Sequence, residues 1–371
     1  MADLLEPAAL FPPAGQHPAW QVLDVRAPVE VQQAALPFAH NLPLMYNDER
    51  QQVGICYKNA GQEAAIALGY QLVGDDLPRR VAAWQDYCQS AATVVMCWRG
   101  GLRSRLVCDF VAEASGTAPL RLHGGYKALR RYLLEQLSPQ LAQRQGLVLA
   151  GQTGSGKTTL LQHAAEHCAA EQLLTFDLEA AANHRGSSFG QLPGGQPSQA
   201  SFENAFMVAL LLSAARTWLL EDESRNIGQR TLPTPLFEAM QRSPLLMVEE
   251  PREARAARIF SDYVCDLSHR QGVAVTHAQL QAALLRLKKP LGTARLEHCL
   301  HSLQHARQPE QWWQLAAHIP WITVLLEDYY DPLYRKGLRA SSRPVAFRGS
   351  YEECQQWLTQ RFPPTSPNPS A

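Results

Sequence analysis

Residues 151–158 read Gly-Gln-Thr-Gly-Ser-Gly-Lys-Thr and match the pattern Gly-x4-Gly-Lys-Ser/Thr at every fixed position. The flanking residues fit this motif. A short apolar run at 146–150 predicts a buried strand, and residues 158–165 predict a helix with Leu160 and Leu161 on one face. A strand, a glycine-rich turn and a helix in this order predict a phosphate-binding loop, or P-loop, in an α/β domain with a parallel sheet.

The chemistry of this loop follows from its residue types. Glycines let successive backbone N–H groups point inward at phosphate oxygens, and the helix N-terminus adds its positive end. We expect Lys157 to neutralise terminal phosphate charge and Thr158 to ligate Mg²⁺. The residues predicted to bind a diphosphate are Gly151, Gly154, Ser155, Gly156, Lys157 and Thr158. The alternative is a glycine-rich turn without a ligand.

A second anion-sized loop begins at Cys97, in the sequence Cys-Trp-Arg-Gly-Gly-Leu-Arg-Ser. An apolar run at 92–96 predicts a strand before it, and residues 105–111 predict a helix after it. The turn aims N–H groups at one point above the sulfur, and Arg99 and Arg103 add positive charge. Because these effects favour the thiolate, we predict a reactive cysteine. The alternative is a buried structural cysteine, the usual fate of a free cysteine.

Composition limits the remaining possibilities. The chain has 371 residues, enough for two domains, with 34 basic and 34 acidic side chains, so any nucleic-acid-binding surface has to be a local patch. No apolar run is long enough for a transmembrane helix, and the first residues lack the positive charge of a signal peptide. The eight cysteines show no metal-ligand spacing. We therefore expect a cytoplasmic protein without disulfides, structural zinc or a membrane segment.

A polar, proline-containing connector at 138–146 separates two α/β patterns. We predict a first domain over 12–137, a second over 146–361 with additional helices, and a disordered, proline-rich tail over 362–371. Further strands are expected at 21–26, 173–177 and 218–220, and amphipathic or helical segments at 61–69, 76–88, 126–137, 202–216, 252–260, 277–287, 309–317 and 350–360.

An apolar strand that ends in acids follows the P-loop at 219–222, Leu-Leu-Glu-Asp. Such a strand can place a carboxylate beside the P-loop Mg²⁺, and we expect Asp222 to be that ligand, together with Thr158. Solvated acids at a strand end are the alternative. The polar loop at 183–190 is either functional or an ordinary surface turn. The further candidates for contact with substrate or support of the site are Asp177, His184, Arg185, Glu221 and Asp222.

The first domain resembles a rhodanese domain, which carries sulfur or selenium on a cysteine. The resemblance rests on Asp-Val-Arg-Ala-Pro-Val-Glu at 24–30, Ala-His-Asn-Leu-Pro at 39–43 and the Cys97 loop. The loop departs from the common six-residue rhodanese form because Arg103 comes one residue later. A wider loop suits a tetrahedral, phosphate-bearing donor, and it leaves the identity of the donor open.

The whole chain is similar to the bacterial tRNA 2-selenouridine synthase family. Besides the two loops, the similarity rests on Asn-Asp-Glu-Arg at 47–50, Val53-Gly54, Tyr57-Lys58, the stretch 177–187 and Glu-Asp-Glu-Ser-Arg-Asn-Ile-Gly at 221–228. The resemblance implies replacement of sulfur by selenium at C2 of the wobble 2-thiouridine in certain tRNAs. The family works in two steps: geranylation of the sulfur from geranyl diphosphate, then displacement of the S-geranyl group using selenophosphate.

The resemblance also implies a role for each loop. The P-loop, with Lys157 and Mg²⁺, would hold geranyl diphosphate and stabilise the diphosphate as it departs. Cys97 would take selenium from selenophosphate as a perselenide, with Arg99 and Arg103 holding the phosphate that leaves. The implied partners are tRNA and a selenophosphate-producing enzyme. The sequence does not indicate an oligomeric state.

Two substrate surfaces are expected on the same basis. The apolar stretch 202–212 is a candidate for the geranyl chain, although an ordinary core helix is the simpler interpretation. A basic surface should contact tRNA phosphates, and the alternative is a solvated charged face. The arginines expected on that surface are Arg185, Arg225, Arg252, Arg255 and Arg258.

Two other functions are compatible with the motifs. A nucleotide-dependent kinase or NTPase fused to a sulfurtransferase would need a base-recognition motif and a water-positioning residue, and we identify neither in the sequence. A phosphate-sensing or scaffolding protein with an inactive rhodanese-like domain would usually lack the cysteine, whereas Cys97 is present.

Overall fold

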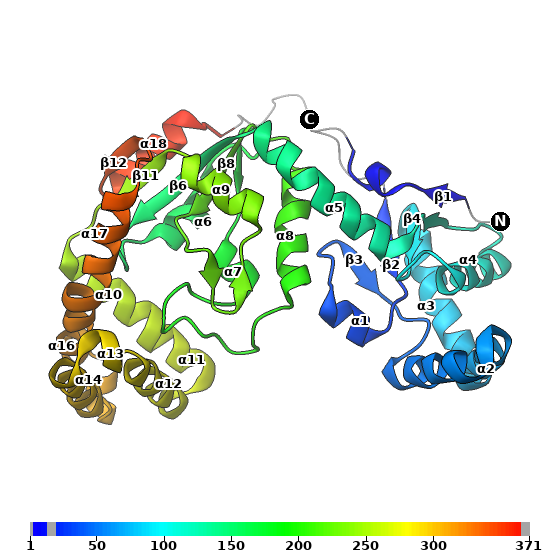
Figure 1. The fold of residues 1–371 in the computed structure, drawn as a ribbon, viewed down its shortest axis with the longest axis horizontal. Helices are drawn as coiled ribbons and strands as arrows, with labels where there is room; N and C mark the ends of the chain where they lie inside the picture. The colour runs from blue at the N-terminus through cyan, green and yellow to red at the C-terminus, as the bar shows by residue number, and fades with distance from the viewer. Residues whose placement is uncertain (1–2, 13–19, 365–371) are drawn as a thin grey trace. The chain divides into compact units, whose positions relative to one another are not determined.

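The computed structural model describes residues 3–12 and 20–364 and confirms an α/β architecture with parallel sheets. The chain folds into two compact units (Figure 1). Unit 1 comprises Met1–Gln140 and Pro197–Ala214, and unit 2 comprises Leu141–Gln196 and Ala215–Ala371. Each unit has its own five-stranded sheet.

The sheet of unit 1 has the strand order β1-β5-β4-β2-β3, and every pair is parallel. The strands are β1 (Leu4–Leu5), β2 (Gln21–Asp24), β3 (Ala39–Asn41), β4 (Thr93–Met96) and β5 (Leu120–Leu122). β4 is the central strand, and all four of its residues are buried. Its sequence, Thr-Val-Val-Met, suits a strand that is covered on both faces, as parallel strands usually are. The carboxyl end of β4 therefore lies at the middle of one sheet edge.

The helices of unit 1 surround this sheet. They are η1 (Pro7–Leu10), α1 (Pro28–Gln33), α2 (Asn47–Val73), η2 (Gly74–Asp76), α3 (Leu77–Ser90), α4 (Leu102–Ser115), α5 (Gly125–Ala142) and α8 (Gln199–Leu212). Trp84 of α3 and Val107 of α4 pack with Leu23 and Val95 of the sheet in one core cluster. α2 is interrupted by Gly61, whose φ of 84° breaks the helical path. The two halves of α2 thus have different directions.

α8 belongs to unit 1, although it lies far along the chain. Its buried Asn204 donates to the carbonyl of Ala35 at 2.7 Å and accepts from Arg130 of α5 at 2.8 Å. Phe202 and Phe206 are 1% exposed. The apolar stretch at 202–212 is thus a core helix. The predicted continuous second domain over 146–361 differs from this division, because an apolar helix carries no signal for which core it joins.

Unit 2 contains a parallel sheet with the strand order β12-β11-β6-β8-β7. The strands are β6 (Gln145–Gly151), β7 (Leu173–Thr175), β8 (Thr217–Glu221), β11 (Leu245–Val248) and β12 (Val345–Gly349), and a separate two-stranded ladder pairs β9 (Asn226–Ile227) with β10 (Arg230–Thr231). β6 is central, and β8 is its direct neighbour, with Leu149 opposite Glu221. The P-loop and the acidic strand end therefore meet at the same sheet edge.

Helices cover this sheet and extend into a helical part toward the C-terminus (Figure 1). They are α6 (Lys157–His167), α7 (Leu178–Ala182), α9 (Thr234–Arg242), α10 (Arg252–Phe260), η3 (Ser261–Cys265), α11 (Asp266–Gln271), α12 (Val273–Arg286), α13 (Lys288–Leu291), α14 (Thr293–Ala306), α15 (Pro309–Trp312), α16 (Leu315–Leu325), η4 (Leu326–Tyr330), α17 (Asp331–Ala340) and α18 (Tyr351–Arg361). No helix among the described residues is long and apolar enough to cross a membrane.

Several boundaries differ from the sequence predictions. The connector at 138–146 is mostly helix, because α5 continues to Ala142 through Pro139. The predicted helix at 309–317 is two helices, α15 and the start of α16. Phe362, predicted to begin a disordered tail, is 7% exposed and packs in the core cluster of α6 and α18. Residues 365–371 of that tail lie outside the described residues.

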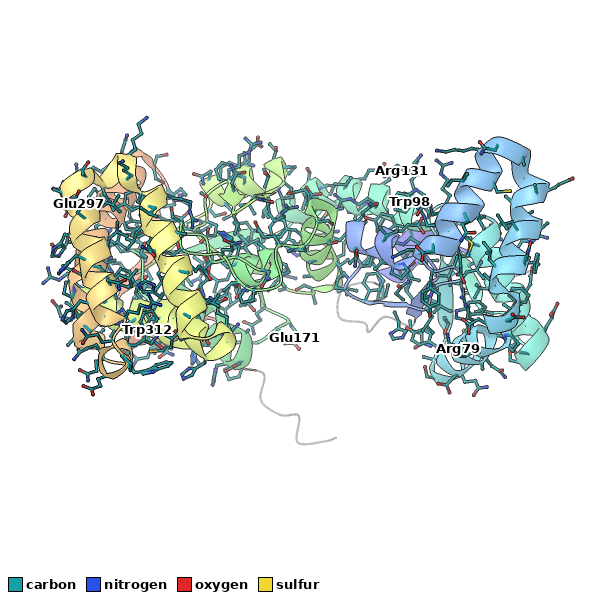
Figure 2. The ribbon with its side chains drawn as sticks, turned by 90° about the horizontal axis from the view of Figure 1, so that it is seen from below. Arg79, Trp98, Arg131, Glu171, Glu297 and Trp312 are labelled. Carbon is teal, nitrogen blue, oxygen red and sulfur yellow. The ribbon has the colours of Figure 1, made fainter. Side chains whose placement is uncertain are left out.

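A histidine lies in the core of the helical part, between two tryptophans. His318 is fully buried, its Nε2 lies 3.0 Å from the carbonyl of Trp312, and its Nδ1 accepts from the indole of Trp321 at 3.1 Å. Figure 2 labels Trp312 among these helices. The two contacts use one donor and one acceptor, so they fit the neutral imidazole with its proton on Nε2. Burial lowers the pKa of His318 from 6.5 to about 4.

We expect the buried, neutral His318 to contribute stability to unit 2 that is lost as pH falls from about 6.5 to about 4. In this window the unfolded chain binds a proton that the folded imidazole rejects, so the contribution of His318 to the free energy of unfolding decreases by up to about 3 kcal/mol. The raised pKa values of Glu221 and Glu223 act in the opposite sense over the same range, so the contribution is measured as a difference between variants. Urea unfolding of the wild type and of His318→Gln at several pH values should give a difference in the free energy of unfolding that decreases as pH falls, and the exposed His301→Gln should keep the pH dependence of the wild type. A difference between the wild type and His318→Gln that does not change with pH would contradict the assignment.

Candidate functional site

The P-loop of unit 2 joins β6 to α6, as predicted. Lys157 begins α6, and its Nζ donates to the carbonyl of Gly151 at 3.0 Å. Gly154 has a φ of 80°, and a Cβ there would lie 2.7 Å from the carbonyl oxygen of Arg255. Only glycine combines this φ with so close a backbone approach. Ser155 is 1% exposed, and its hydroxyl oxygen is buried without a hydrogen-bond partner among the described residues.

Arg255 of α10 holds the P-loop in place. Its side chain is buried, Nε donates to the carbonyl of Thr153 at 2.8 Å, and the guanidinium forms a 2.6 Å ion pair with Asp331. It also donates to the side chain of Gln152 at 3.1 Å. A buried guanidinium with these partners fixes the loop backbone between β6 and α6. Sequence reasoning missed this function, since the pairing joins residues far apart in the chain.

Arg255 therefore does not lie on the expected arginine surface, and three of the other expected members are paired with acids. Arg255 is 2% exposed, Arg258 pairs with Glu250 at 2.9 Å, and Arg185 pairs with Asp266 at 2.9 Å. Arg252 pairs with Glu327 and Glu253 on the surface. Their spacing by three does not line one open face, because the α10 helix turns Arg255 toward the P-loop. Arg225 is exposed and hydrogen-bonds to Thr234.

Three carboxylates gather beside the P-loop. Oxygens of Glu179, Glu221 and Glu223 all lie within 4.8 Å of one another. The Thr158 side chain hydrogen-bonds to Glu221, and Lys157 interacts electrostatically with all three. Glu221 is 2% exposed, and its Oε1 is buried with no hydrogen-bond partner among the described residues. We call this set the acidic cluster.

Burial explains the electrostatics of the acidic cluster. It raises the pKa values of Glu179, Glu221 and Glu223, and repulsion between their carboxylates adds to the effect. Lys157 opposes the shift. A hard divalent cation would remove the repulsion, and carboxylate oxygens with a threonine hydroxyl are the donors that Mg²⁺ prefers. The orphaned Oε1 of Glu221 therefore fits a cation ligand.

Asp222, the expected Mg²⁺ ligand, has another role. It forms a two-armed ion pair with Arg343 at 2.8 and 3.0 Å. Successive strand residues point to opposite faces, so the residue that faces Thr158 is Glu221 and not Asp222. The sequence predicted that β8 ends in acidic residues, and it does. The acidic residue that faces Thr158 is Glu221, one residue before the predicted Asp222.

The predicted loop at 183–190 supports the acidic cluster. The backbone N–H of Gly186 donates to Glu179, and Asp177 caps α7 by accepting from the N–H of Ala180 at 2.8 Å. Arg185 donates to the carbonyl of Asp262 and stacks over Tyr263 at 5.1 Å. These contacts place Asp177 and Arg185 in support of the loop.

His184 lines a polar cavity of about 570 Å³ with Asn183, Gln196 and Arg286. Burial lowers its pKa, and its Nδ1 has no hydrogen-bond partner among the described residues. The neutral imidazole is therefore its form at neutral pH. Gln196 joins the two sides of this cavity, because it donates to the carbonyls of Ala182 and Ile227, each at 3.0 Å.

The Cys97 loop of unit 1 lies at the carboxyl end of β4 and leads into α4, as predicted. Cys97 is 3% exposed, and its Sγ lies 3.3 Å from the hydroxyl of Ser104. The carbonyl of Cys97 accepts from the N–H of Tyr126 at 2.8 Å. Gly125 allows this contact, because a Cβ there would overlap that carbonyl.

The backbone N–H groups of the Cys97 loop are available to an anion. In the part of the chain that the structure describes, no backbone or side-chain acceptor takes a hydrogen bond from the N–H groups of residues 98–101. The first N–H groups of α4 are also free of helical bonds, as at any helix start. Together these N–H groups create a positive electrostatic potential beside Cys97.

The two loop arginines contribute differently. Arg103 makes a two-armed ion pair with Glu30 at 2.6 and 3.0 Å, and Arg50 lies 3.5 Å from the same carboxylate. Burial opposes ionisation of Glu30, but the hydrogen bonds and charge of Arg103 outweigh it and lower its pKa. Arg99 is exposed. The charge of Arg103 is therefore largely balanced by Glu30. The sequence did not predict this role of Glu30, because Glu30 lies far from Cys97 in the chain.

Arg255→Ala should reduce the affinity of the P-loop for pyrophosphate by at least about tenfold. The substitution frees the carbonyl of Thr153 and leaves Asp331 without its partner, which typically destabilises by about 3–5 kcal/mol. Calorimetric titration with pyrophosphate and Mg²⁺ measures the affinity, and thermal unfolding measures the stability. Arg252→Ala on the same helix is the matched control, because that side chain is half exposed. Unaltered pyrophosphate binding by Arg255→Ala would refute its bracing role.

Comparisons with known proteins show which family the chain belongs to. Residues 144–363 match the family model described as the tRNA 2-selenouridine synthase AAA domain. The tRNA 2-selenouridine synthase of Aeromonas salmonicida (strain A449) is 40% identical over 364 residues, covering 92% of this chain and 93% of the relative. The synthase of Serratia proteamaculans (strain 568) is 42% identical, covering 91% and 92%. That of Bordetella bronchiseptica (strain ATCC BAA-588 / NCTC 13252 / RB50) is 40% identical, covering 96% and 97%. The chain belongs to the tRNA 2-selenouridine synthase family.

Proposed function

We propose that this enzyme converts the wobble 2-thiouridine of tRNA to 2-selenouridine in two steps, each at one of the two loops. The observation that carries the proposal is the extent of the similarity: relatives named tRNA 2-selenouridine synthase cover both units, 92% of the chain in the first case. The first step is S-geranylation from geranyl diphosphate at the P-loop. The second is selenation from selenophosphate at Cys97.

We propose a rhodanese-like fold for unit 1. The central strand of a parallel sheet ends at Cys97, and ligands of such sheets bind at the carboxyl ends of the strands. The loop joins this strand to the N-terminus of α4, which favours an anionic sulfur or selenium. All eight cysteines of the chain are free. This fits the reducing cytoplasm in which we place the reaction.

In the geranylation step, the thiocarbonyl sulfur attacks the first carbon of the geranyl chain. The carbon–sulfur bond forms, the carbon–oxygen bond breaks with its electron pair on the diphosphate, and the base releases its N3 proton. Lys157 and the loop N–H groups hold the diphosphate and stabilise its growing charge. Arg255 keeps the loop in the conformation that does this. The reaction gains speed because these donors are positioned before the charge develops.

The acidic cluster fits Mg²⁺ in this step. Glu221 and the hydroxyl of Thr158 would hold it, with Glu179 and Glu223 as the neighbouring donors. When bound, the ion supplies charge stabilisation for the departing diphosphate. Lys157 lies beside the same carboxylates and keeps part of their charge balanced.

In the selenation step, the thiolate of Cys97 attacks the selenium of selenophosphate and the sulfur–selenium bond forms. The selenium–phosphorus bond breaks with its electron pair on phosphorus, so selenium is oxidised to the perselenide level and phosphorus leaves, reduced, as phosphite. The N–H groups of residues 98–101 and the exposed Arg99 hold that oxyanion. The terminal selenium of the perselenide then attacks C2 and expels geranyl thiol. A cellular thiol cleaves the remaining sulfur–selenium bond and releases the selenouridine. S-alkylation matters because it turns a poor leaving group into a thiol.

The partners follow from these substrates. tRNA needs basic contacts with its phosphates, and exposed side chains such as Arg99 and Arg225 are available for them. Each phosphate contact adds slightly under one unit to the dependence of log affinity on log salt. We also propose a selenophosphate-producing enzyme as the supplier of the selenium donor.

Cys97→Ala should abolish selenouridine and leave S-geranyl-2-thiouridine to accumulate, because only the second step needs the thiolate. Mass spectrometry of tRNA nucleosides after incubation with geranyl diphosphate and selenophosphate distinguishes the products. Cys88→Ala is the control, since that cysteine lies in α3 beside Thr93, at the opposite end of β4 from Cys97. Normal selenation by Cys97→Ala would remove Cys97 from the mechanism.

Lys157→Ala should abolish geranylation, because the departing diphosphate loses its main cation. Supplying tRNA that already carries the S-geranyl group should restore selenation in this variant. Lys288→Ala, an exposed lysine on α13, is the matched control. If Lys157→Ala geranylates normally but loses ATP hydrolysis, the protein is a nucleotide-dependent kinase or NTPase fused to a sulfurtransferase instead.

A further inference from the structure

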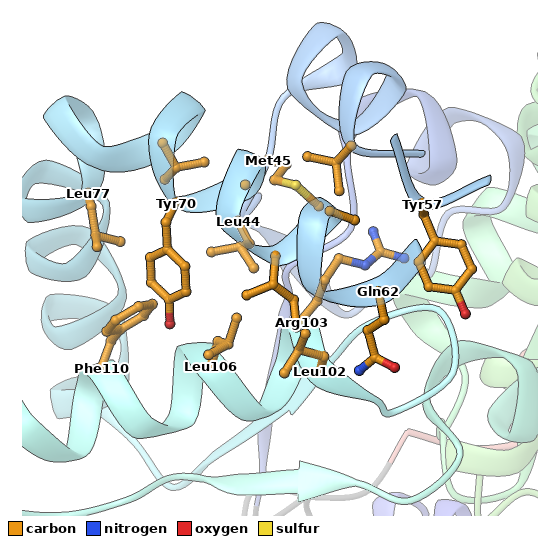
Figure 3. A pocket seen from close by; sticks show the side chains of 15 residues that line it. Leu44, Met45, Tyr57, Gln62, Tyr70, Leu77, Leu102, Arg103, Leu106 and Phe110 are labelled. Carbon is orange, nitrogen blue, oxygen red and sulfur yellow. The ribbon is translucent and has the colours of Figure 1, made fainter. Parts of the chain in front are cut away.

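Unit 1 contains an apolar cavity of about 350 Å³ beside the Cys97 loop (Figure 3). α2, α3 and α4 contribute its walls, with side chains such as Val53, Ile66, Leu77, Leu106 and Phe110. This volume lies within the usual range of cavities that bind small molecules. The mechanism described above assigns no role to it.

The cavity has one polar end and one apolar end. Figure 3 shows Arg103, Gln62 and Tyr57 at one end, and Leu77 and Phe110 at the other. Arg103 follows the Cys97 loop on the first turn of α4, whereas Phe110 lies two turns further along the same helix. The lining of α4 from residue 102 to residue 110 therefore spans about 12 Å. The polar end is the one next to Cys97.

Large apolar side chains at the cavity are open to solvent. Tyr57 is 58% exposed, Tyr70 48% and Leu102 39%. Apolar surface that gathers in a concave site, and is not buried by the chain itself, is a common mark of a ligand site. Val53 and Tyr57 belong to sequence motifs that the two reaction loops leave without a role. The cavity gives these residues a shared location.

We propose that this cavity binds the geranyl chain of the S-geranylated nucleoside during selenation. The inference rests on the proposed function, because it takes its ligand from the first step. A geranyl group has an eight-carbon main chain, which extends to about 9 Å at the advance per bond of an extended chain. Its length suits the 12 Å lining estimated above, and its lack of polar atoms suits the walls.

The charge pattern supports this occupant over an anionic one. Among the described residues that line the cavity, Arg103 is the one with a charged side chain, and it is already paired with Glu30. An amphiphile with a phosphate or carboxylate head would have to compete with Glu30 for that guanidinium. A neutral alkyl chain joined through sulfur to a nucleobase needs no cation. With the chain in the cavity, its sulfur end lies toward the Cys97 loop.

The apolar cavity at the P-loop does not compete for the same chain. It is lined by Thr153, Phe189, Ile259 and Trp321, and its volume is about 20 Å³. That is about the space of one water molecule. The chain-sized apolar site thus lies in the unit that carries Cys97, where the geranyl thiol has to leave.

The cavity would position the substrate and not take part in bond making. Selenium attacks C2, the carbon–selenium bond forms, and the carbon–sulfur bond breaks with its electron pair on the geranyl thiolate. Binding of the chain holds C2 near the perselenide. Since S-methyl and S-geranyl groups leave as alkyl thiolates of similar basicity, their chemical reactivity is similar. A difference between the selenation rates of the S-methyl and S-geranyl substrates therefore measures how much the cavity contributes to binding of the geranyl chain.

The test compares selenation of two RNA oligonucleotides, one with S-geranyl-2-thiouridine and one with S-methyl-2-thiouridine, by the full-length enzyme with selenophosphate. A single methylene in an apolar pocket is typically worth about tenfold or more, so the wild type should prefer the geranyl substrate by at least about 100-fold in kcat/KM. Ile66→Trp, which fills the cavity, should bring this ratio close to one. Ile55→Trp is the matched control, on the same helix, 52% exposed and outside the cavity. It should keep the wild-type ratio.

Three results would overturn the inference. A wild-type ratio near one, or a ratio that Ile66→Trp leaves unchanged while Ile66→Trp retains the wild-type unfolding temperature, would refute the cavity and leave the proposed function standing. Selenation of neither oligonucleotide by the wild type would refute the proposed function, and the inference with it. Tyr70→Ser provides a second variant without added volume, and it should lower the ratio through lost apolar contact.

Discussion

Three carboxylates beside the P-loop, one buried and two half-buried, are the feature on which the candidate site of unit 2 depends. Glu179, Glu221 and Glu223 repel each other, and a buried carboxylate is costly unless a cation or a proton compensates it. Lys157 supplies one compensating charge, and Thr158 supplies a hydrogen bond. The arrangement is therefore poised for a second cation and for an anion bound to that cation. In the proposed function, that anion is the diphosphate of the first step.

Unit 1 reaches an anion site by different means. Glu30 neutralises the charge of Arg103 in an ion pair, so Arg103 mainly connects α1 and α4. Besides the exposed side chain of Arg99, what remains for an incoming anion is the backbone: the N–H groups of residues 98–101 and the start of α4. Backbone dipoles stay in place when a ligand leaves, whereas arginine side chains relax. This suits the proposed selenation step, in which the site binds and releases a phosphorus oxyanion in every cycle.

Local pattern was enough to predict both loops, the flanking strands and helices, and helix α10 with its observed bounds. Each of these features is determined within a few residues, by glycine, apolar periodicity or strand ends. The errors concern partners far apart in sequence. Arg255 was expected at the surface because its pairing with Asp331 leaves no local trace. Asp222 was predicted as the Mg²⁺ ligand in place of Glu221, because the alternation of side chains along a strand does not reveal which face of the strand meets the P-loop. α8 was expected in the second domain, because an apolar helix carries no signal for which core it joins.

The pairing of charges inside the protein also bears on how it can recognise RNA. The chain has equal numbers of basic and acidic side chains, and several arginines, among them Arg26, Arg80, Arg255 and Arg343, are buried in ion pairs. These groups are fixed by the fold and contribute little to the field outside. A polyanion therefore has to be held by the exposed arginines that remain, which are fewer than the sequence count suggests. In the proposed reaction, specificity for one nucleoside would come from contacts with the base and, after the first step, from the apolar chain attached to it. The apolar cavity beside Cys97 would provide such a contact without any added charge.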